Sequence, residues 1–305
     1  MNIAVMIPCY NEEQTVKRVI KDFQRELSGA TCYVYDNNSS DNTVIEARKA
    51  GAIVSNESNQ GKGNVVRRMF REIDADIYIM VDGDNTYPAE FIHQLIIPVK
   101  KNTADIVVGD RLSNDSYIKA NKRSFHTFGN YLVRALINRL FKSDLKDIMS
   151  GYRVFNKKFV KTMPVTSNGF EIEVEMALHA LDKKFIIKEL PIEYRDRPEG
   201  SFSKLNTFTD GTLILKSILW IFKDYKPLIF FSLISFIFFS FGLLVGIPVV
   251  VEFLKTDYIT KVPSAVLSTG LMLISILSLF SGFILDTIVK HQKENFELYL
   301  NQLNL

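Results

Sequence analysis

The sequence predicts an α/β protein with a mostly parallel sheet, followed by a hairpin of two membrane-spanning helices. Two observations support this prediction. Over residues 1–225, short apolar runs alternate with stretches of helical periodicity, which is typical of parallel α/β sheets. Beyond them, uncharged apolar runs occupy 228–251 and 262–285, and each exceeds the roughly 20 residues that cross a bilayer.

The predicted strands and helices alternate along the chain. Strands are expected at 3–7, 32–35, 52–54 and 77–81, and helices at 16–23, 44–50 and 65–73. In parallel α/β sheets, ligands bind beyond the carboxyl ends of the strands. Because Asp36 and Asp82 each follow a strand at that end, we expect both to line one crevice.

Composition excludes some classes of function. The net charge of +3 is too small to imply a nucleic-acid partner. Cys9 and Cys32 have no metal-ligand spacing and lie in or beside apolar runs, which predicts buried free thiols in a reducing compartment. The run 3–7 follows Met1 directly and is expected to be a strand, so no signal peptide is predicted.

Basic residues predict the orientation of the hairpin. Lysines precede the first apolar run at 216, 223 and 226, and basic residues follow the second at 290, 291 and 293. By the positive-inside rule, the protein is expected to be a multi-pass protein of the cytoplasmic membrane, with both termini in the cytoplasm. The expected parts are a cytoplasmic domain (1–205), a juxtamembrane interfacial helix (206–226), the hairpin (227–289) and a cytoplasmic tail (290–305). Two core helices of a soluble protein are the rejected alternative, because such helices keep a polar face.

Asp82-Gly83-Asp84 directly follows the strand at 77–81. The motif would suit a simple turn, since Asp and Gly favour turns. Two carboxylates beside an open groove also suit Mg²⁺ or Mn²⁺, which bridges a substrate diphosphate and keeps several waters. The position after a buried strand favours the metal interpretation.

Six segments, in order, resemble the motifs of one family. They are Ile7-Pro8-Cys9-Tyr10-Asn11-Glu12, Asp36-Asn37-Asn38-Ser39-Ser40-Asp41, Asn59-Gln60-Gly61-Lys62-Gly63, Asp82-Gly83-Asp84, Asp147-Ile148-Met149-Ser150-Gly151-Tyr152-Arg153 and Arg197-Pro198-Glu199-Gly200-Ser201-Phe202-Ser203-Lys204. The chain resembles family 2 glycosyltransferases of the GT-A fold, in the branch that makes polyprenyl-phosphate sugars. It departs from the family's Asp-Asp-Gly-Ser at Asn37 and Asn38, and from its Gln-His-Pro at 85–88.

The resemblance implies a nucleotide-diphosphate sugar donor and a divalent cofactor, Mg²⁺ or Mn²⁺, on Asp82 and Asp84. Asp36 would accept a hydrogen bond from the base, and Lys62 lies at a glycine-rich bend suited to anions. The nucleotide-sugar site would comprise Pro8, Tyr10, Glu12, Asp36, Lys62, Asp82, Gly83, Glu171 and Glu173. Glu171 and Glu173 have an alternative role as first-turn acids of a helix. The catalytic set would comprise Asp84, Arg197 and Lys204.

The resemblance also implies a polyprenyl phosphate acceptor drawn from the lipid bilayer, and homo-oligomers formed through the membrane helices. The basic, aromatic stretch 119–142 is expected to be an interfacial helix, with a core helix of solvated basic face as the alternative. The residues expected at the lipid phosphate are Arg123, Arg134, Ser150 and Arg153. UDP-glucose and UDP-N-acetylglucosamine are the favoured donors, followed by GDP-mannose. A processive synthase is disfavoured because Gln-x-x-Arg-Trp is missing, and an inactive sensor because Asp84 and Arg197 are present.

Overall fold

The computed structural model describes residues 1–113, 124–169, 171–195 and 219–302. The chain divides into two compact units, one over residues 1–212 and one over 213–304. Each unit is described by itself.

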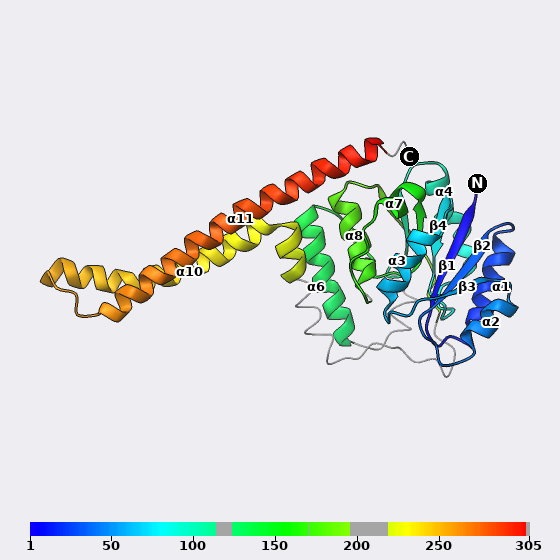
Figure 1. Cartoon of the computed structure of the whole chain (residues 1–305), viewed down its shortest axis with the longest axis horizontal. Coiled ribbons are helices and arrows are strands. Elements are labelled where there is room, and N and C mark those ends of the chain that lie inside the picture. The colour runs from blue at the N-terminus through cyan, green and yellow to red at the C-terminus, as the bar shows by residue number, and fades with distance from the viewer. Residues whose placement is uncertain (114–123, 170, 196–218, 303–305) are drawn as a thin grey trace. The chain divides into compact units, whose positions relative to one another are not determined.

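The first unit is built on a seven-stranded sheet in the order β3-β2-β1-β4-β6-β5-β7 (Figure 1). The strands are β1 (Ile3–Cys9), β2 (Thr31–Asp36), β3 (Ile53–Asn56), β4 (Ile77–Met80), β5 (Ile106–Asp110), β6 (Arg153–Asn156) and β7 (Ile187–Pro191). Among the described strands, β6 runs antiparallel to its neighbours, β4 and β5, and the other pairings are parallel. The mostly parallel α/β sheet predicted from the sequence is therefore confirmed.

Helices cover both faces of this sheet. The described helices of this unit are α1 (Val16–Glu26), α2 (Thr43–Lys49), α3 (Lys62–Glu72), the short 3₁₀ helix η1 (Ala89–Phe91), α4 (Ile92–Lys100), α6 (Ser124–Phe141), α7 (Lys157–Thr162) and α8 (Ile172–Asp182). Among them, α6 contacts α8. The apolar residues of α1, α2 and α4 form one core cluster with alternate residues of β1, β2 and β4. Helices α3 and α7 contact the sheet strands from outside that cluster. Because β4 is covered on both sides, all four of its residues are buried.

The four predicted strands match β1 to β4, and the predicted helices match α1, α2 and α3. The second half of the sheet, with β5, β6 and β7, is not among the elements expected from the sequence. Strand β6 reads Arg-Val-Phe-Asn and begins with a charged residue that is fully buried, so its pattern lacks the apolar run of a buried strand.

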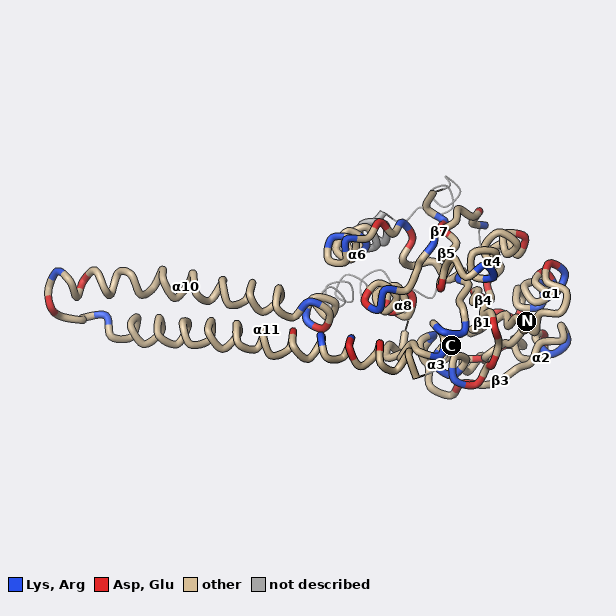
Figure 2. The backbone as a smooth tube through the Cα atoms, turned by 90° about the horizontal axis from the view of Figure 1, so that it is seen from above, with Lys and Arg blue, Asp and Glu red and all other residues tan. Residues whose placement is uncertain are grey.

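The second unit contains a helix over 219–225, α10 (Pro227–Thr256) and α11 (Val262–Gln302). Helices α10 and α11 pack on each other through small residues: the hydroxyls of Ser235 and Ser275 lie 3.0 Å apart, and Ser268 Oγ donates to Gly242 O at 2.8 Å. Both helices are long and apolar enough to cross a membrane. In the most apolar 18-residue stretch of each, only 6% of the residues of α10 and 11% of those of α11 are buried. Figure 2 shows that charged residues are sparse along the hairpin and gather at its loop and ends. The apolar surface is thus exposed rather than packed into a core. Helix α11 continues past the predicted span end at 285.

Candidate functional site

The candidate site lies at the carboxyl ends of three adjacent strands, β2, β1 and β4. Asp36 is the last residue of β2 and pairs in register with Cys9, the last residue of β1. Asp82 follows β4, whose next residue, Val81, donates its backbone N–H to Met6 O at 3.1 Å. Because the three strands are parallel neighbours, their ends bring Asp36 and Asp82 to the same edge of the sheet.

Asp36 carries a buried carboxylate of which one oxygen has no protein donor. The residue is 3% exposed, and its Oδ2 accepts the backbone N–H of Ser39 at 3.0 Å. Across the described part of the chain, no group donates a hydrogen bond to Oδ1. A buried acceptor without a donor costs free energy, so Oδ1 is suited to an N–H group of a ligand.

Asn37 and Asn38 have structural reasons to differ from the family pattern. The Asn37 amide donates to Glu57 O at 3.0 Å and to Asn59 O at 2.8 Å, and its Oδ1 accepts the Gly61 N–H at 2.6 Å. A carboxylate could not donate the first two bonds. Asn38 has φ +63°, a left-handed conformation that asparagine tolerates where the family has glycine.

The Asp82-Gly83-Asp84 backbone is tightly held. Thr15 Oγ1 donates to Gly83 O at 2.6 Å, and a Cβ on Gly83 would lie 2.8 Å from Cys9 Sγ. Asp84 is 3% exposed, and its Oδ1 accepts from Thr86 Oγ1 at 2.7 Å. The glycine is therefore required for the β1 and β4 ends to approach each other.

The positive partner of Asp82 is Lys62, at the first turn of α3. Lys62 Nζ lies 2.5 Å from Asp82 Oδ1 and 2.5 Å from Glu173 Oε1. The Lys62 and Glu173 side chains are only 10% and 7% exposed. Burial lowers the pKa of Lys62, but the charges of Asp82 and Glu173 outweigh burial and hold it above its ordinary value. The ammonium is therefore a permanent charge beside the carboxylate pair.

A clamped loop brings Glu173 to this place. Gly63 N donates to Asn168 O at 3.0 Å, and a Cβ on Gly63 would lie 2.2 Å from Ser167 O. Arg67 Nε donates to Val165 O at 2.7 Å, while Glu175 accepts the Ser167 N–H at 3.0 Å. The loop before α8 is thus fixed to the N-terminus of α3 on one side and to α8 on the other.

The remaining residues expected at the nucleotide differ in their place and exposure. Pro8 belongs to β1, and Tyr10 just beyond it is 38% exposed. Glu12 accepts the backbone N–H of Val16 at 2.9 Å through its carbonyl, at the start of α1. Glu171 is an exposed residue that immediately precedes α8, in contrast to the buried Glu173.

The segment Asp147 to Arg153 is buried, and sequence reasoning missed its main partner, Arg111. Arg111 forms a two-point ion pair with Asp147, with Nε to Oδ2 at 2.8 Å and Nη2 to Oδ1 at 2.9 Å. Burial raises the pKa of Asp147, but Arg111 outweighs it and keeps the carboxyl ionised. No spacing in the sequence links these two residues, which are 36 positions apart.

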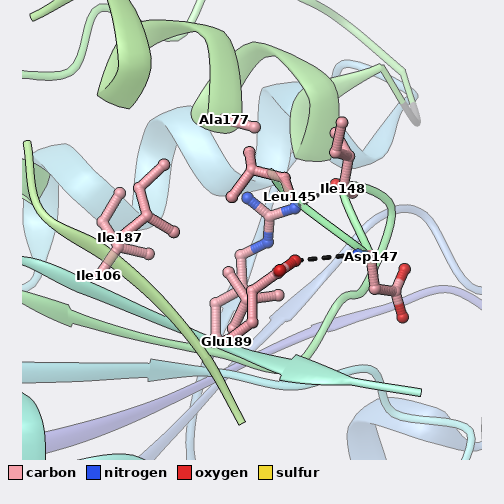
Figure 3. A pocket seen from close by; sticks show the side chains of 9 residues that line it. Ile106, Leu145, Asp147, Ile148, Ala177, Ile187 and Glu189 are labelled. Carbon is pink, nitrogen blue, oxygen red and sulfur yellow. Dashed lines mark hydrogen bonds between the residues drawn. The ribbon is translucent and has the colours of Figure 1, made fainter. Parts of the chain in front are cut away.

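Ser150 and Arg153, expected at the lipid phosphate, lie inside the domain. Their exposures are 0% and 1%. Arg153 Nε donates to Ser150 O at 2.8 Å, and Nη2 donates to Ile148 O. Arg153 also lines a small cavity with Asp147 and Glu189. Figure 3 shows Glu189 accepting the Asp147 backbone N–H, at 2.9 Å, with apolar side chains around the pair.

The other residues expected at the acceptor are less fully described. Arg134, on α6, donates from Nη1 to Lys146 O at 3.1 Å and lies over the ring of Tyr131, which is 57% exposed. Arg123, Arg197 and Lys204 lie outside the described residues.

Asp82 and Asp84 fit the donor set of a hard divalent ion. Among the described residues no group of three or more His, Cys, Asp or Glu side chains could hold a metal alone. Two carboxylates one residue apart suffice for Mg²⁺ or Mn²⁺ when substrate phosphates and water complete the shell. The buried Asp84 carboxylate, oriented by Thr86, could supply one such ligand.

Comparison with known proteins identifies the family. The sequence profile of glycosyl transferase family 2 matches residues 4–163, more than half of the chain. The protein belongs to this family. Glycosyltransferase AglJ of Haloferax volcanii is 31% identical over 296 residues, which is 97% of this chain and 96% of that protein. The dolichyl-phosphate hexose transferase of the same organism is 29% identical over 217 residues, 71% of this chain and 92% of that one.

Solved structures agree with this fold. A Mycobacterium tuberculosis glucosyl-3-phosphoglycerate synthase, crystallised with Mn²⁺, UDP and glucosyl-3-phosphoglycerate, superposes with a TM-score of 0.57 at 21% identity, over 73% of this chain and 79% of that one. The protein is therefore a family 2 glycosyltransferase with the GT-A fold, as the sequence motifs predicted.

Proposed function

We propose that this glycosyltransferase moves a sugar from a nucleotide-diphosphate donor to a polyprenyl phosphate at the cytoplasmic face of a membrane, with inversion at the anomeric carbon. UDP-glucose and UDP-N-acetylglucosamine are the favoured donors, and GDP-mannose is the next. The cluster of Lys62, Asp82 and Glu173 beside the carboxyl ends of β1 and β4, in which Lys62 and Glu173 are largely buried and Asp82 is 28% exposed, is the observation that carries this proposal.

Asp36 is assigned to the base of the donor. Its Oδ1 is buried and receives no hydrogen bond from the described protein. A uracil ring presents one imide N–H, which matches a single carboxylate acceptor. Hydrogen bonds to a charged acceptor contribute more than neutral ones, so Asp36 would contribute strongly to donor affinity.

Lys62 and the carboxylate pair are assigned to the diphosphate end. A divalent ion held by Asp82 and Asp84 would neutralise charge that develops on the leaving nucleotide. Lys62 would add a fixed positive charge at the first turn of α3, where the helix dipole also favours anions. The Asp84 carboxylate is kept in one orientation by Thr86, so it needs no reorganisation when the donor binds.

Two observations support a lipid phosphate as the acceptor: the apolar hairpin and the similarity to a dolichyl-phosphate hexose transferase. Helices α10 and α11 are long enough to span a bilayer, and a relative is a dolichyl-phosphate hexose transferase. A lipid phosphate already carries a nucleophilic oxygen at neutral pH, because its second pKa is about 6 by analogy with phosphoserine. The reaction then requires no strong general base. Arg134 on α6, with Arg123, Arg197 and Lys204, would meet the acceptor and the leaving phosphates.

The test is a transfer assay with the purified full chain in detergent. Undecaprenyl phosphate, Mn²⁺ and a panel of UDP-glucose, UDP-N-acetylglucosamine and GDP-mannose would be supplied, and lipid extracts read by mass spectrometry. We expect one donor to yield a lipid-phosphate sugar. Asp84→Ala should abolish it, while Glu46→Ala, at a partly exposed position of α2 where Glu46 pairs with Lys49, should not. Transfer to water-soluble acceptors alone would contradict the lipid assignment.

A further inference from the structure

We infer that Glu173 is a positioning residue for the donor site: it holds Lys62 in place, and Lys62 in turn fixes the first carboxylate of the Asp82-Gly83-Asp84 motif. This inference rests on the proposed use of a nucleotide-diphosphate donor, and it differs from a direct contact between Glu173 and the sugar.

The placement of Glu173 favours the indirect role. Its side chain is 7% exposed, and its Oε1 is engaged by Lys62 Nζ at 2.5 Å. Glu171, two residues earlier, is exposed and precedes the helix. Of the two acids, Glu173 therefore faces the interior of the domain, where its charge acts on Lys62.

Glu173 is itself held by a rigid support. The loop before it contacts Gly61 and Gly63 so closely that a Cβ on either would lie 2.1 or 2.2 Å from a loop carbonyl oxygen. Arg67 and Glu175 hold the same loop through several hydrogen bonds. A residue on such a support can set the position of a flexible lysine with little loss of entropy.

Asp82 is confined at both oxygens. Oδ1 contacts Lys62 at 2.5 Å, and Oδ2 lies against Gly151, where a Cβ would come within 2.5 Å of it. Lys62 and Gly151 therefore restrict the Asp82 carboxylate on two sides. A movement of Lys62 would therefore be transmitted directly to Asp82.

The charges explain why a carboxylate is needed at position 173. Burial lowers the pKa of Arg153, and Glu173 is the largest of the charges that oppose this effect. Glu173 thus compensates the charges of two buried cations. It contacts Lys62 directly, and it acts on Arg153 by longer-range electrostatic attraction. Without the Glu173 carboxylate, Lys62 would keep only Asp82 of its two carboxylate contacts. The Lys62 and Asp82 side chains would then move together from their present positions.

A double-mutant cycle on nucleotide binding tests the inference. Affinity of the full chain for UDP with Mn²⁺, and for GDP with Mn²⁺ in parallel, would be measured by calorimetry for wild type, Glu173→Gln, Lys62→Met and the double variant. Glu173→Gln loses the charged hydrogen bond to Lys62, and Lys62→Met loses those to both Asp82 and Glu173, so we expect each single variant to bind roughly tenfold more weakly or worse. The double variant should bind no more than about twofold more weakly than Lys62→Met, because the two residues act as one unit.

The controls separate this role from others. Glu72→Gln, on the exposed face of α3, should leave affinity unchanged, and Glu173→Asp should restore part of it. UDP carries no sugar, so an unchanged UDP affinity in Glu173→Gln would overturn the inference in favour of a sugar contact. Additive losses in the double variant would overturn it too. A wild-type chain that binds neither nucleotide would overturn the proposed function and this inference together.

Discussion

Asp36 is a buried carboxylate whose Oδ1 needs a donor from outside the described protein. Asp36→Asn replaces the charged acceptor by an amide of the same shape. We expect the KM for the donor to rise roughly tenfold or more, because a hydrogen bond to a charged group contributes about 1.5–3 kcal/mol. Steady-state kinetics would measure it. The exposed Asp74→Asn is the control, and equal KM values in both variants would remove Asp36 from the donor site.

The second prediction concerns Asn37, which stands where the family motif has its second Asp. Asn37→Asp places a carboxylate against the carbonyls of Glu57 and Asn59, which now accept from the amide. We expect a loss of about 2–4 kcal/mol of unfolding free energy, since one buried and one partly buried hydrogen bond are lost. Urea denaturation would measure it, with the exposed Asn102→Asp as control. If the Asn37→Asp variant were as stable as wild type, these bonds would contribute little.

Sequence reasoning predicted the position of the candidate residues in the fold better than their contacts. Asp36, Lys62, Asp82 and Asp84 follow predicted strands or open a predicted helix, so their place at one sheet edge could be foreseen. The contact of Lys62 with Glu173 joins residues 111 positions apart, and no local pattern encodes it. The sequence predicts a metal ion as the positive charge at Asp82 and Asp84, and the structure adds a cation of the protein itself, Lys62, which lies between Asp82 and Glu173.

At the scale of elements, the packing of α3 on the loop before α8 leads to a third prediction. Gly63→Ala places a Cβ 2.2 Å from Ser167 O, closer than any real contact. The loop must move, which we expect to cost about 1–3 kcal/mol as overpacking. It should also weaken donor binding, because Glu173 moves with the loop. Gly270→Ala, whose Cβ would meet nothing within 4 Å, is the matched control for thermal unfolding and kinetics. Unchanged donor KM in Gly63→Ala would contradict this coupling.

Helix α8 also predicts a pH dependence of stability. Burial and then Lys183 lower the pKa of His179 to about 4, against the opposing charges of Asp182 and Glu175. The neutral ring packs against Phe159 and Phe185. The unfolded chain therefore takes up a proton first as the pH falls. The contribution of the neutral His179 ring to the free energy of unfolding is complete above pH 6.5, and it is lost as the pH falls toward 4.

This loss should amount to about 3 kcal/mol, at 1.36 kcal/mol for each pKa unit. Denaturation of wild type and His179→Gln at pH 7 and pH 4 would measure it. The variant should lose less stability than wild type over this interval. Equal losses would show that His179 does not titrate between the folded and unfolded states.

The elements themselves were predictable only where their periodicity is regular. The predicted helical residues 16, 19, 20 and 23 are those that α1 buries, because an amphipathic pattern directly reports the buried face. Beyond β4, the apolar run of β5 was a missed signal, whereas β6 contains the buried Arg153 and β7 alternates polar and apolar residues at a partly exposed position, so these two strands were not predictable. A charge that the fold compensates through distant residues cannot be recognised as buried from the sequence alone.

At the scale of the whole molecule, the uneven distribution of charge matches the division into two units. Charged residues are frequent on the sheet and its helices, whereas in the hairpin they are almost confined to the loop and the ends (Figure 2). Apolar helices that stay largely exposed in water would aggregate, so a lipid environment is the arrangement that stabilises them. An enzyme with an acceptor in the bilayer would be kept at its substrate by this anchor.

The orientation of that anchor is the last prediction, and the native cysteines make it simple to test. Cys9 and Cys32 are buried, and burial raises the pKa of Cys32 to about 11, so neither should react with a water-soluble thiol reagent. Tyr258→Cys then places a single reactive thiol in the loop between the two helices, where Tyr258 is 75% exposed. Glu297→Cys places one on the exposed face of α11 near its C-terminal end.

By the positive-inside rule, the loop faces outward and the chain ends face the cytoplasm. In sealed right-side-out vesicles, a membrane-impermeant maleimide should label Tyr258→Cys at once and Glu297→Cys only after detergent is added. Wild type, with its two buried thiols, serves as the unlabelled control. Labelling of Glu297→Cys in sealed vesicles would place the tail, and with it the donor site, on the side without nucleotide sugars, and it would contradict both the orientation and the proposed reaction.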